Sequence, residues 1–394
     1  MKKALAVMLT ALMFLTSCSN ADGKDNDNVQ KKRDYVQGSL GLTASSAITD
    51  DTVYFKPFQS SKSIKYADIE AGIGGVLCGK PECTHTDSSC NAYTSYAVPG
   101  LSDYDRALYW TTSEGFDYYI CKENYDGTDR VVVRELDSQT MQTLNTNSLS
   151  FAHRGYMFYC SGTFTIENGE TKYISQVFAY SLEGDDDCIK IYEKYVPNTY
   201  YTSVRMRAYN DALYIMNRSG DVTGDKPCLE LYKWNINTHD IETLYTGEVP
   251  FSAWEFYIID DGILISESTG GKIYFYSFEE QTISDYLDFN GESEDFDYIS
   301  ISNGFFIGQI PDDDKETVMI RVIDITGKLI LDSAFSVDFI DKEQWTHMSI
   351  TLCGADENYV YNLYSGSQGS DEYLVAIPLD GSDVRVLYSY IGDG

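Results

Sequence analysis

Apolar and polar positions recur in one unit along most of the chain. A turn containing Asn, Asp or Gly precedes a short apolar strand rich in Tyr, Phe, Val and Ile, and the unit occurs seven times. The seven strands begin at residues 52, 107, 156, 212, 262, 305 and 359. Successive starts are 43 to 56 residues apart, which is the spacing expected for a four-stranded blade with loop insertions.

A further apolar strand follows the first in most of these intervals. These strands cover residues 118–121, 177–180, 229–232, 273–276, 319–322 and 373–376. Turns such as Asp126-Gly127 and Asp380-Gly381 then lead to a weaker outer strand. One such sheet cannot bury both of its faces, but sheets packed face to face around an axis can.

The pattern therefore predicts an all-β chain, with residues 45–394 forming a seven-bladed β-propeller of four-stranded antiparallel blades. A set of β-sandwiches and a β-solenoid are the competing architectures. Solenoid coils are shorter than these intervals, and sandwiches rarely repeat one strand pattern seven times. No apolar run with helical periodicity, long enough for a major helix, follows Leu15.

The N-terminus has the features of an export signal. Two lysines precede the apolar run 4–15, which is too short to span a bilayer. The run ends in Leu15-Thr16-Ser17-Cys18, which resembles the lipobox of bacterial lipoproteins, whose cysteine is lipidated and becomes the first mature residue. We therefore expect a leader at 1–17, lipidation at Cys18 and a polar, flexible linker over 18–44. An ordinary secretory signal and a buried apolar helix are the alternatives.

The charge of the chain excludes one class of partner. It has 29 Lys and Arg against 61 Asp and Glu, a net charge of −32. Such a field repels phosphate backbones, so we expect no binding to nucleic acid. It also opposes adsorption to anionic lipid, so the lipid on Cys18 must attach the protein to the membrane. We expect an extracytoplasmic, membrane-anchored monomer.

One segment has the composition of a metal site. Cys78, Cys83, His85 and Cys90 lie within 13 residues, in a segment whose Gly, Pro, Ser and Asp predict a loop. Three thiolates and an imidazole can bind Zn²⁺ tetrahedrally, and four filled positions favour a structural ion over a catalytic one. The spacing departs from the usual C-x2-C pairs, because His85 follows Cys83 too closely for an easy bite. A disulfide, expected outside the cytoplasm, and plain free thiols are the alternatives.

Several of these features resemble a known group of proteins. The lipobox, the seven turn-strand units and endings such as Pro378-Leu379-Asp380-Gly381-Ser382 resemble propeller lipoproteins of uncharacterised function from anaerobic Gram-positive bacteria. Those proteins are related at the repeat level to TolB-like and YWTD-type propellers. Leu108-Tyr109-Trp110-Thr111 resembles one YWTD unit, but Thr112 stands where Asp would follow. The resemblance covers about residue 45 to the end and implies the fold, not a ligand.

The sequence predicts no catalytic residue and no organic cofactor. It contains no H-E-x-x-H, no G-x-S-x-G and no G-x-x-x-x-G-K-[ST] motif. The leading hypothesis is a non-enzymatic binding or scaffold propeller for a surface protein, peptide or glycan. The alternatives are a propeller enzyme acting on extracellular glycans or peptides, and a metal-binding protein that uses the 78–90 loop.

Overall fold

The computed structural model describes residues 45–394, apart from 58–61, 95–99, 116, 137–148, 168–169, 185–187, 198–199, 222–226, 292–295, 346, 367–370 and 392–394. The leader at 1–17, Cys18 and the linker at 18–44 lie outside the described residues. The described part contains 28 strands and one helical turn, α4 (Lys342–Trp345). None of its helices has the length and apolar character needed to cross a membrane.

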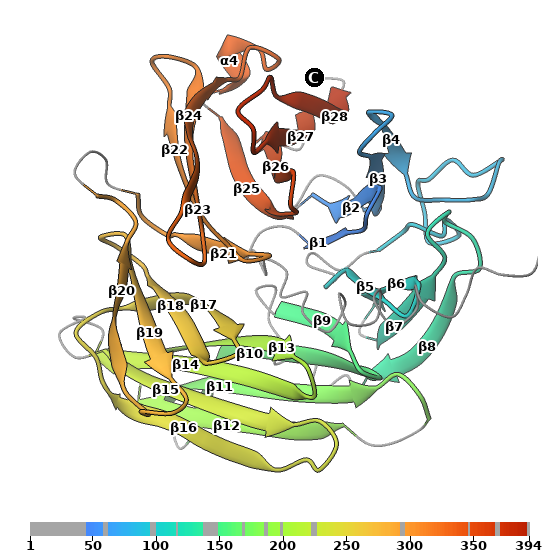
Figure 1. The fold of residues 1–394 in the computed structure, drawn as a ribbon. Coiled ribbons are helices and arrows are strands. Elements are labelled where there is room, and N and C mark those ends of the chain that lie inside the picture. The colour runs from blue at the N-terminus through green and yellow to red at the C-terminus, as the bar shows by residue number, and fades with distance from the viewer. Residues whose placement is uncertain are drawn as a thin grey trace, which may run out of the picture. The chain divides into compact units, whose positions relative to one another are not determined.

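The strands form seven sheets, and each sheet is built from four consecutive strands paired in chain order. We number these blades 1 to 7 along the chain (Figure 1). Blades 1 to 3 comprise β1 (Ser45–Ile48), β2 (Thr52–Lys56), β3 (Lys65–Asp68), β4 (Ile73–Val76), β5 (Ser102–Tyr104), β6 (Ala107–Glu114), β7 (Asp117–Glu123), β8 (Val131–Leu136), β9 (Leu149–His153), β10 (Tyr156–Glu167), β11 (Glu170–Ser181) and β12 (Ile189–Pro197).

Blades 4 to 7 repeat the same arrangement. They comprise β13 (Tyr200–Tyr209), β14 (Ala212–Asp221), β15 (Cys228–Asn235), β16 (Ile241–Glu248), β17 (Ala253–Ile259), β18 (Gly262–Glu267), β19 (Lys272–Ser277), β20 (Ile283–Asp288), β21 (Ser300–Ser302), β22 (Phe305–Asp312), β23 (Thr317–Asp324), β24 (Leu329–Ser336), β25 (Met348–Ala355), β26 (Tyr359–Gly366), β27 (Asp371–Pro378) and β28 (Arg385–Ile391). All pairings are antiparallel, as in β22 with β23 and β26 with β27. The predicted seven-bladed propeller of four-stranded antiparallel blades is confirmed.

The side chains of the middle strands explain why the blades pack in a ring. In β23, Val318, Ile320 and Val322 join a core with blade 7, while the alternate residues Met319 and Ile323 contact a core with blade 5. Successive side chains of a strand point to opposite faces of the sheet. Both faces of the blade are therefore apolar, and each needs a neighbouring blade to bury it.

The hydrophobic core is divided among the junctions between blades. The described residues form seven buried clusters, and each cluster combines side chains from two neighbouring blades. The cluster between blades 1 and 7 includes Val53 and Phe55 from β2 with Leu363 and Leu374 from β26 and β27. The N-terminal blade thus lies against the C-terminal blade, and the ring is closed (Figure 1).

The ring closes without exchanging a strand between its ends. Blade 1 contains only β1 to β4, and blade 7 contains only β25 to β28. Polar contacts add to the apolar cluster at this junction: Ser46 Oγ donates to the carbonyl of Cys353 at 2.7 Å, and Lys65 forms a buried ion pair with Glu372. Packing and these contacts therefore hold the first and last blades together.

Candidate metal centre

The structure brings together the four predicted ligands of the 78–90 loop. The donor atoms of Cys78, Cys83, His85 and Cys90 all lie within 4.8 Å of one another. His85 Nδ1 is 3.4 Å from Cys90 Sγ. In a tetrahedral zinc site with bonds of about 2.3 Å, sulfur atoms lie about 3.8 Å apart. The donor set and its dimensions therefore fit a Zn²⁺ ion after a shift of about 1 Å.

The backbone at His85 resolves the difficulty of its spacing. His85 has a φ of 59°, in the left-handed region that non-glycine residues seldom adopt. This conformation reverses the chain directly after Cys83 and returns the imidazole towards Cys90. The turn that follows is closed by Asp87, whose carboxylate accepts the Ser89 N–H at 2.9 Å. In regular structure, the short spacing between Cys83 and His85 would keep the two side chains from one ion. The strained backbone of His85 allows both to face the same site.

The thiols of the cluster differ in acidity. Burial raises the pKa of the Cys78 thiol, but the backbone N–H groups of Lys80 and Asn91 and the neighbouring thiols outweigh burial and lower it. Burial raises the pKa of Cys90 to about 12. Of these two thiols, Cys78 therefore ionises more readily. Zinc ligation requires deprotonated thiols, so a bound cation would supply the charge that the other thiols need in order to ionise.

Blade 2 supports the loop from one side. The carbonyl of Gly127, in the turn between β7 and β8, accepts the Gly79 N–H at 2.8 Å. A Cβ atom at position 127 would lie 2.7 Å from the backbone nitrogen of Cys78, so this turn requires glycine. Arg130, which follows the same turn, donates to the carbonyl of Cys90 at 3.0 Å. The cluster is therefore part of the junction between blades 1 and 2.

One further cysteine, Cys121, lies beside the site, in the same apolar cluster as Cys78, Cys83 and Cys90. The other cysteines lie elsewhere in the fold. Cys121, Cys160 and Cys353 are buried in strands, as expected for small apolar side chains. All eight described cysteines are free thiols in this structure. Cys18, the predicted lipidation site, is outside the described residues.

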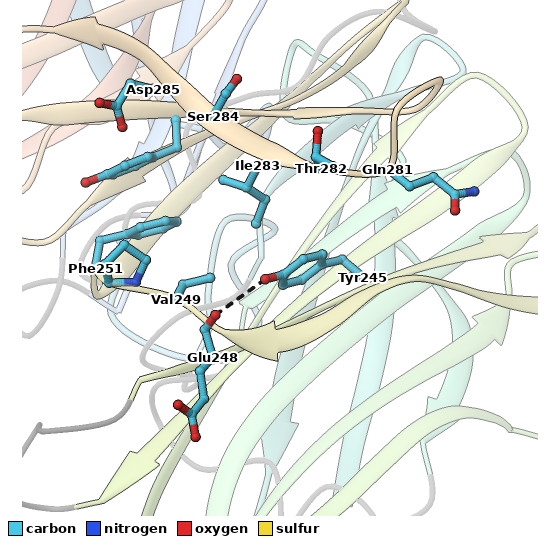
Figure 2. Close-up of a pocket in the computed structure, with 11 residues that line it drawn as sticks. Tyr245, Glu248, Val249, Phe251, Gln281, Thr282, Ile283, Ser284 and Asp285 are labelled. Atoms are coloured by element: carbon cyan, nitrogen blue, oxygen red, sulfur yellow. Dashed lines mark hydrogen bonds between the residues drawn. The ribbon is translucent and has the colours of Figure 1, made fainter.

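A surface pocket of about 370 Å³ lies between the outermost strands of blades 4 and 5. Its apolar floor includes Phe251, which stacks on Tyr274 with ring centroids 3.7 Å apart. Figure 2 shows the Tyr245 hydroxyl donating to the carbonyl of Glu248, at 3.5 Å. The carboxylates at its edge, Glu248 and Asp285, are exposed. The pocket has the character of a contact surface, because no buried acid or base lines it.

One cluster was missed by the sequence reasoning. Arg205, Arg218, Trp254 and Tyr298 come from blade 4, blade 5 and the segment leading to blade 6, and they meet near the inner strands. They are separated by up to 93 residues and share no motif. Only the packing of successive blades brings them together, so no sequence signal could have identified them.

No protein-family profile matches this sequence, and no curated protein matches it. Solved structures do. The acylaminoacyl peptidase of Pyrococcus horikoshii superposes with a TM-score of 0.52 at 14% identity, over 92% of this chain and 53% of that chain. The β-propeller domain of the Trilobed protease from Pyrococcus furiosus, described as having an open velcro topology, gives a TM-score of 0.50 at 12% identity, over 89% of this chain and 98% of that one. What they share with this chain is the propeller fold.

The extent of these matches limits what they imply. The chain spans about half the length of the peptidase it matches. TolB from Acinetobacter baumannii is also among the matched structures, with a TM-score of 0.36 and 10% identity over 75% of this chain and 61% of that chain. That superposition is too loose to support an argument. The structural neighbours therefore include TolB and other propellers, at the level of fold.

Proposed function

We propose that this chain is a lipid-anchored, extracytoplasmic binding or scaffold propeller whose 78–90 loop holds one structural zinc ion. The observation that carries the proposal is the Cys₃His cluster, whose four donor atoms lie within 4.8 Å of one another. Four protein ligands fill the tetrahedral positions of Zn²⁺ and leave none for a substrate or an activated water. An ion there belongs to the scaffold, not to a catalytic step.

The bound ion would stabilise the junction between blades 1 and 2. Cys78 follows β4 directly, and Cys90 is held through its carbonyl by Arg130 of blade 2. An ion that joins Cys78 to Cys90 would fix the loop in the position that the turn at Gly127 contacts. Its charge would also keep the thiolates ionised in a half-buried site.

Metal analysis of the full chain, purified without chelator, tests the zinc proposal. We expect one zinc per chain in the wild type and none in Cys83→Ser. Cys228→Ser, which alters a half-buried cysteine outside the cluster, should retain the metal. Thiols are then titrated in denaturant with chelator present, and all should react. Protein without zinc and with two thiols missing would replace the metal with a disulfide.

The lipid anchor is supported by Leu15-Thr16-Ser17-Cys18 and the polar residues that follow. Cells grown with an alkyne fatty acid should incorporate it into the wild-type chain and not into Cys18→Ala. The variant should also move from the membrane fraction to the soluble fraction. A variant that loses the label but stays in the membrane fraction would show that something other than the lipid anchors the protein.

The binding role is tested against the enzyme alternative. The peptidases among the structural neighbours lend the alternative its support, at the level of fold. We expect cross-linking on intact cells to capture a stoichiometric surface partner, with no product released from panels of peptides and glycans. Turnover that persists through repurification of the chain would favour the enzyme.

A further inference from the structure

The inner end of blades 4 and 5 holds a group of arginines with few acidic partners. Arg207 pairs with the buried carboxylate of Glu255 at 3.2 Å and also donates to the carbonyl of Ile301 at 3.0 Å. Arg205, two residues earlier on β13, has no ion pair or hydrogen bond among the described residues, and its Nε is buried without a partner. Arg218 on β14 donates only to a backbone carbonyl, that of Ala253, at 2.7 Å.

Arg205 and Arg218 share one aromatic ring. Each guanidinium lies 5.4 Å from the ring centroid of Trp254. Trp254 occupies an irregularity in the pairing of β17 with β18, between Ala253 and Glu255. Such bulges re-aim a side chain and are frequent beside binding sites. The indole therefore holds two like charges close together, which stabilises each by a cation–π contact but leaves their mutual repulsion.

The cluster is open to solvent through an aromatic neighbour. Tyr298 meets Trp254 edge to face at 4.9 Å, and its side chain is 55% exposed. Tyr298 precedes β21, and Trp254 lies near the start of β17, so both residues are near the starts of inner strands. Because every blade runs through its strands in the same order, these starts lie at one end of the ring. Arg205 and Arg218 are themselves only half-buried, so a ligand would meet them at the surface beside Tyr298.

The local charge of this cluster is positive, whereas the net charge of the chain is negative. The net charge is −32, with 61 acidic residues, yet Arg205 forms no ion pair in the described part of the chain, and the nearby Glu255 is paired with Arg207. Burial lowers the pKa of Arg218, and the nearby charge of Arg205 lowers it further. Arrangements that cost folding free energy without a structural return are typical of binding sites.

We propose that Arg205 and Arg218, with Trp254 and Tyr298, bind the carboxylate group of a compact monoanionic ligand. A guanidinium presents a planar set of N–H donors that matches a carboxylate. An aromatic rim suits the apolar or sugar-ring body to which the carboxylate is attached. A polyanion would be repelled by the rest of the acidic protein, whereas one carboxylate within a Debye length of about 10 Å responds mainly to the local arginines.

The proposal rests on the binding role and specifies its ligand chemistry. Two sources present such a group: the C-terminus of a short peptide and a hexuronic acid. The probes are therefore N-acetyl-dipeptides and their C-terminal amides in one arm, with glucuronate and glucose in the other. Trp254 fluorescence reports binding, because the other three tryptophans are at most 3% exposed. We expect one acid to shift the emission, while its neutral counterpart does not.

Arg205→Gln separates the site from the fold. It should weaken binding of the active acid at least tenfold while leaving the urea midpoint unchanged or higher, because it removes a repelled charge. Arg385→Gln is the control: this arginine also lies over a ring, that of Tyr359, and donates to a carbonyl, that of Glu70, and its loss should leave binding unchanged.

Three results would overturn the proposal: no response to any acid, equal responses to acids and neutral analogues, or a large loss of stability in Arg205→Gln. Cross-linking is run in parallel on the wild type and Arg205→Gln. A partner captured equally by both, with no acid binding, would reject this site and leave the binding role in place. If the wild type captures no partner and also binds no acid, both the site and the binding role are rejected.

Discussion

The two sides of blade 1 are stabilised in different ways. On the blade 2 side, the loop of Cys78 to Cys90 packs against the turn at Gly127 and is held by Arg130. On the blade 7 side there is no such loop, and a buried ion pair between Lys65 and Glu372 joins the blades instead. Each junction has ten buried hydrophobic residues, a number between the eight of the junction of blades 2 and 3 and the fifteen of the junction of blades 6 and 7.

Blade 1 is built from short strands, and polar contacts add to its packing on both sides. Its strands have four or five residues each, whereas β10 and β11 of blade 3 have 12 each. A short sheet buries less apolar area, and burial contributes about 25 cal/mol per Å². In blade 1, polar groups therefore supplement apolar packing at both junctions. We expect one side to respond to metal and oxidation and the other side to respond to protonation.

The largest effect is expected when the ion pair of the blade 7 junction is broken. Lys65→Ala leaves Glu372 buried without this lysine and should lower the free energy of unfolding by about 3–5 kcal/mol. Urea unfolding at pH 7 measures the loss. Lys65→Met/Glu372→Leu is the matched control and should stay within about 1 kcal/mol of the wild type, because it removes both charges. A double variant as unstable as the single one would show that shape, not charge, matters there.

Removing the metal from the blade 2 junction should have the next largest effect. If the loop binds zinc, free zinc at about a hundred times the dissociation constant stabilises the folded chain by about 2.7 kcal/mol relative to chelator. Melting in zinc-buffered and chelator-containing solutions measures the difference, and Cys83→Ser should show none. Equal melting temperatures of the wild type in both buffers would show that zinc does not stabilise the junction between blades 1 and 2.

Protonation of Lys56 should affect the blade 7 side. Burial lowers the pKa of Lys56 to about 8, an effect that Glu372 partly offsets and Lys65 increases. The unfolded chain keeps this proton up to a pH of about 10.4. Between these values the unfolded state binds more protons, so the contribution of Lys56 to stability rises as pH rises. Lys56→Met should be more stable than the wild type at pH 7 by about 2 kcal/mol, and the gap should close by pH 10. If the free energies of unfolding of the wild type and Lys56→Met differ by the same amount at every pH from 7 to 10, the assignment to Lys56 is wrong.

The smallest effect separates backbone strain from contact at the blade 2 turn. Gly127 and Gly115 have φ values of +75° and +64°, but only position 127 has neighbours within 4 Å of an added Cβ. Alanine costs strain at both sites, and at 127 it should also push the turn from Cys78. We expect Gly127→Ala to be less stable than Gly115→Ala by about 1 kcal/mol, as measured by urea unfolding. Equal losses would mean that the turn moves aside freely.

The fold was predictable wherever a strand is buried on both faces. The seven predicted strand starts coincide with the first residues of β2, β6, β10, β14, β18, β22 and β26, the second strand of each blade. These strands are continuously apolar because two neighbouring blades cover them. The first strands were not predicted individually, because short ones such as Ser102–Tyr104 and Ser300–Ser302 are rich in serine and resemble turns.

The candidate sites also differ in how much of them could be predicted from the sequence. The Cys/His set was found because its four donors are local in sequence, although the left-handed backbone at His85 and the support from Gly127 were not foreseen. The arginines around Trp254 could not be found, because blade packing brings them together over a separation of many residues. A site whose residues are close together in the sequence can be predicted from one sequence. A site formed by residues from several blades can be found only in the structure.

The closure of the ring without an exchanged strand has a consequence for chain connectivity. Among the described strands, none belongs to a blade formed from the other end of the chain, so the order in which the blades are synthesised is not part of the architecture. A circular permutant that starts at β13, with a linker from Ile391 to Ser45, would contain the same seven blades and the same junctions. The position of the N-terminus can thus be moved to another blade without changing the fold. Whole blades are the natural units for such rearrangements of the chain.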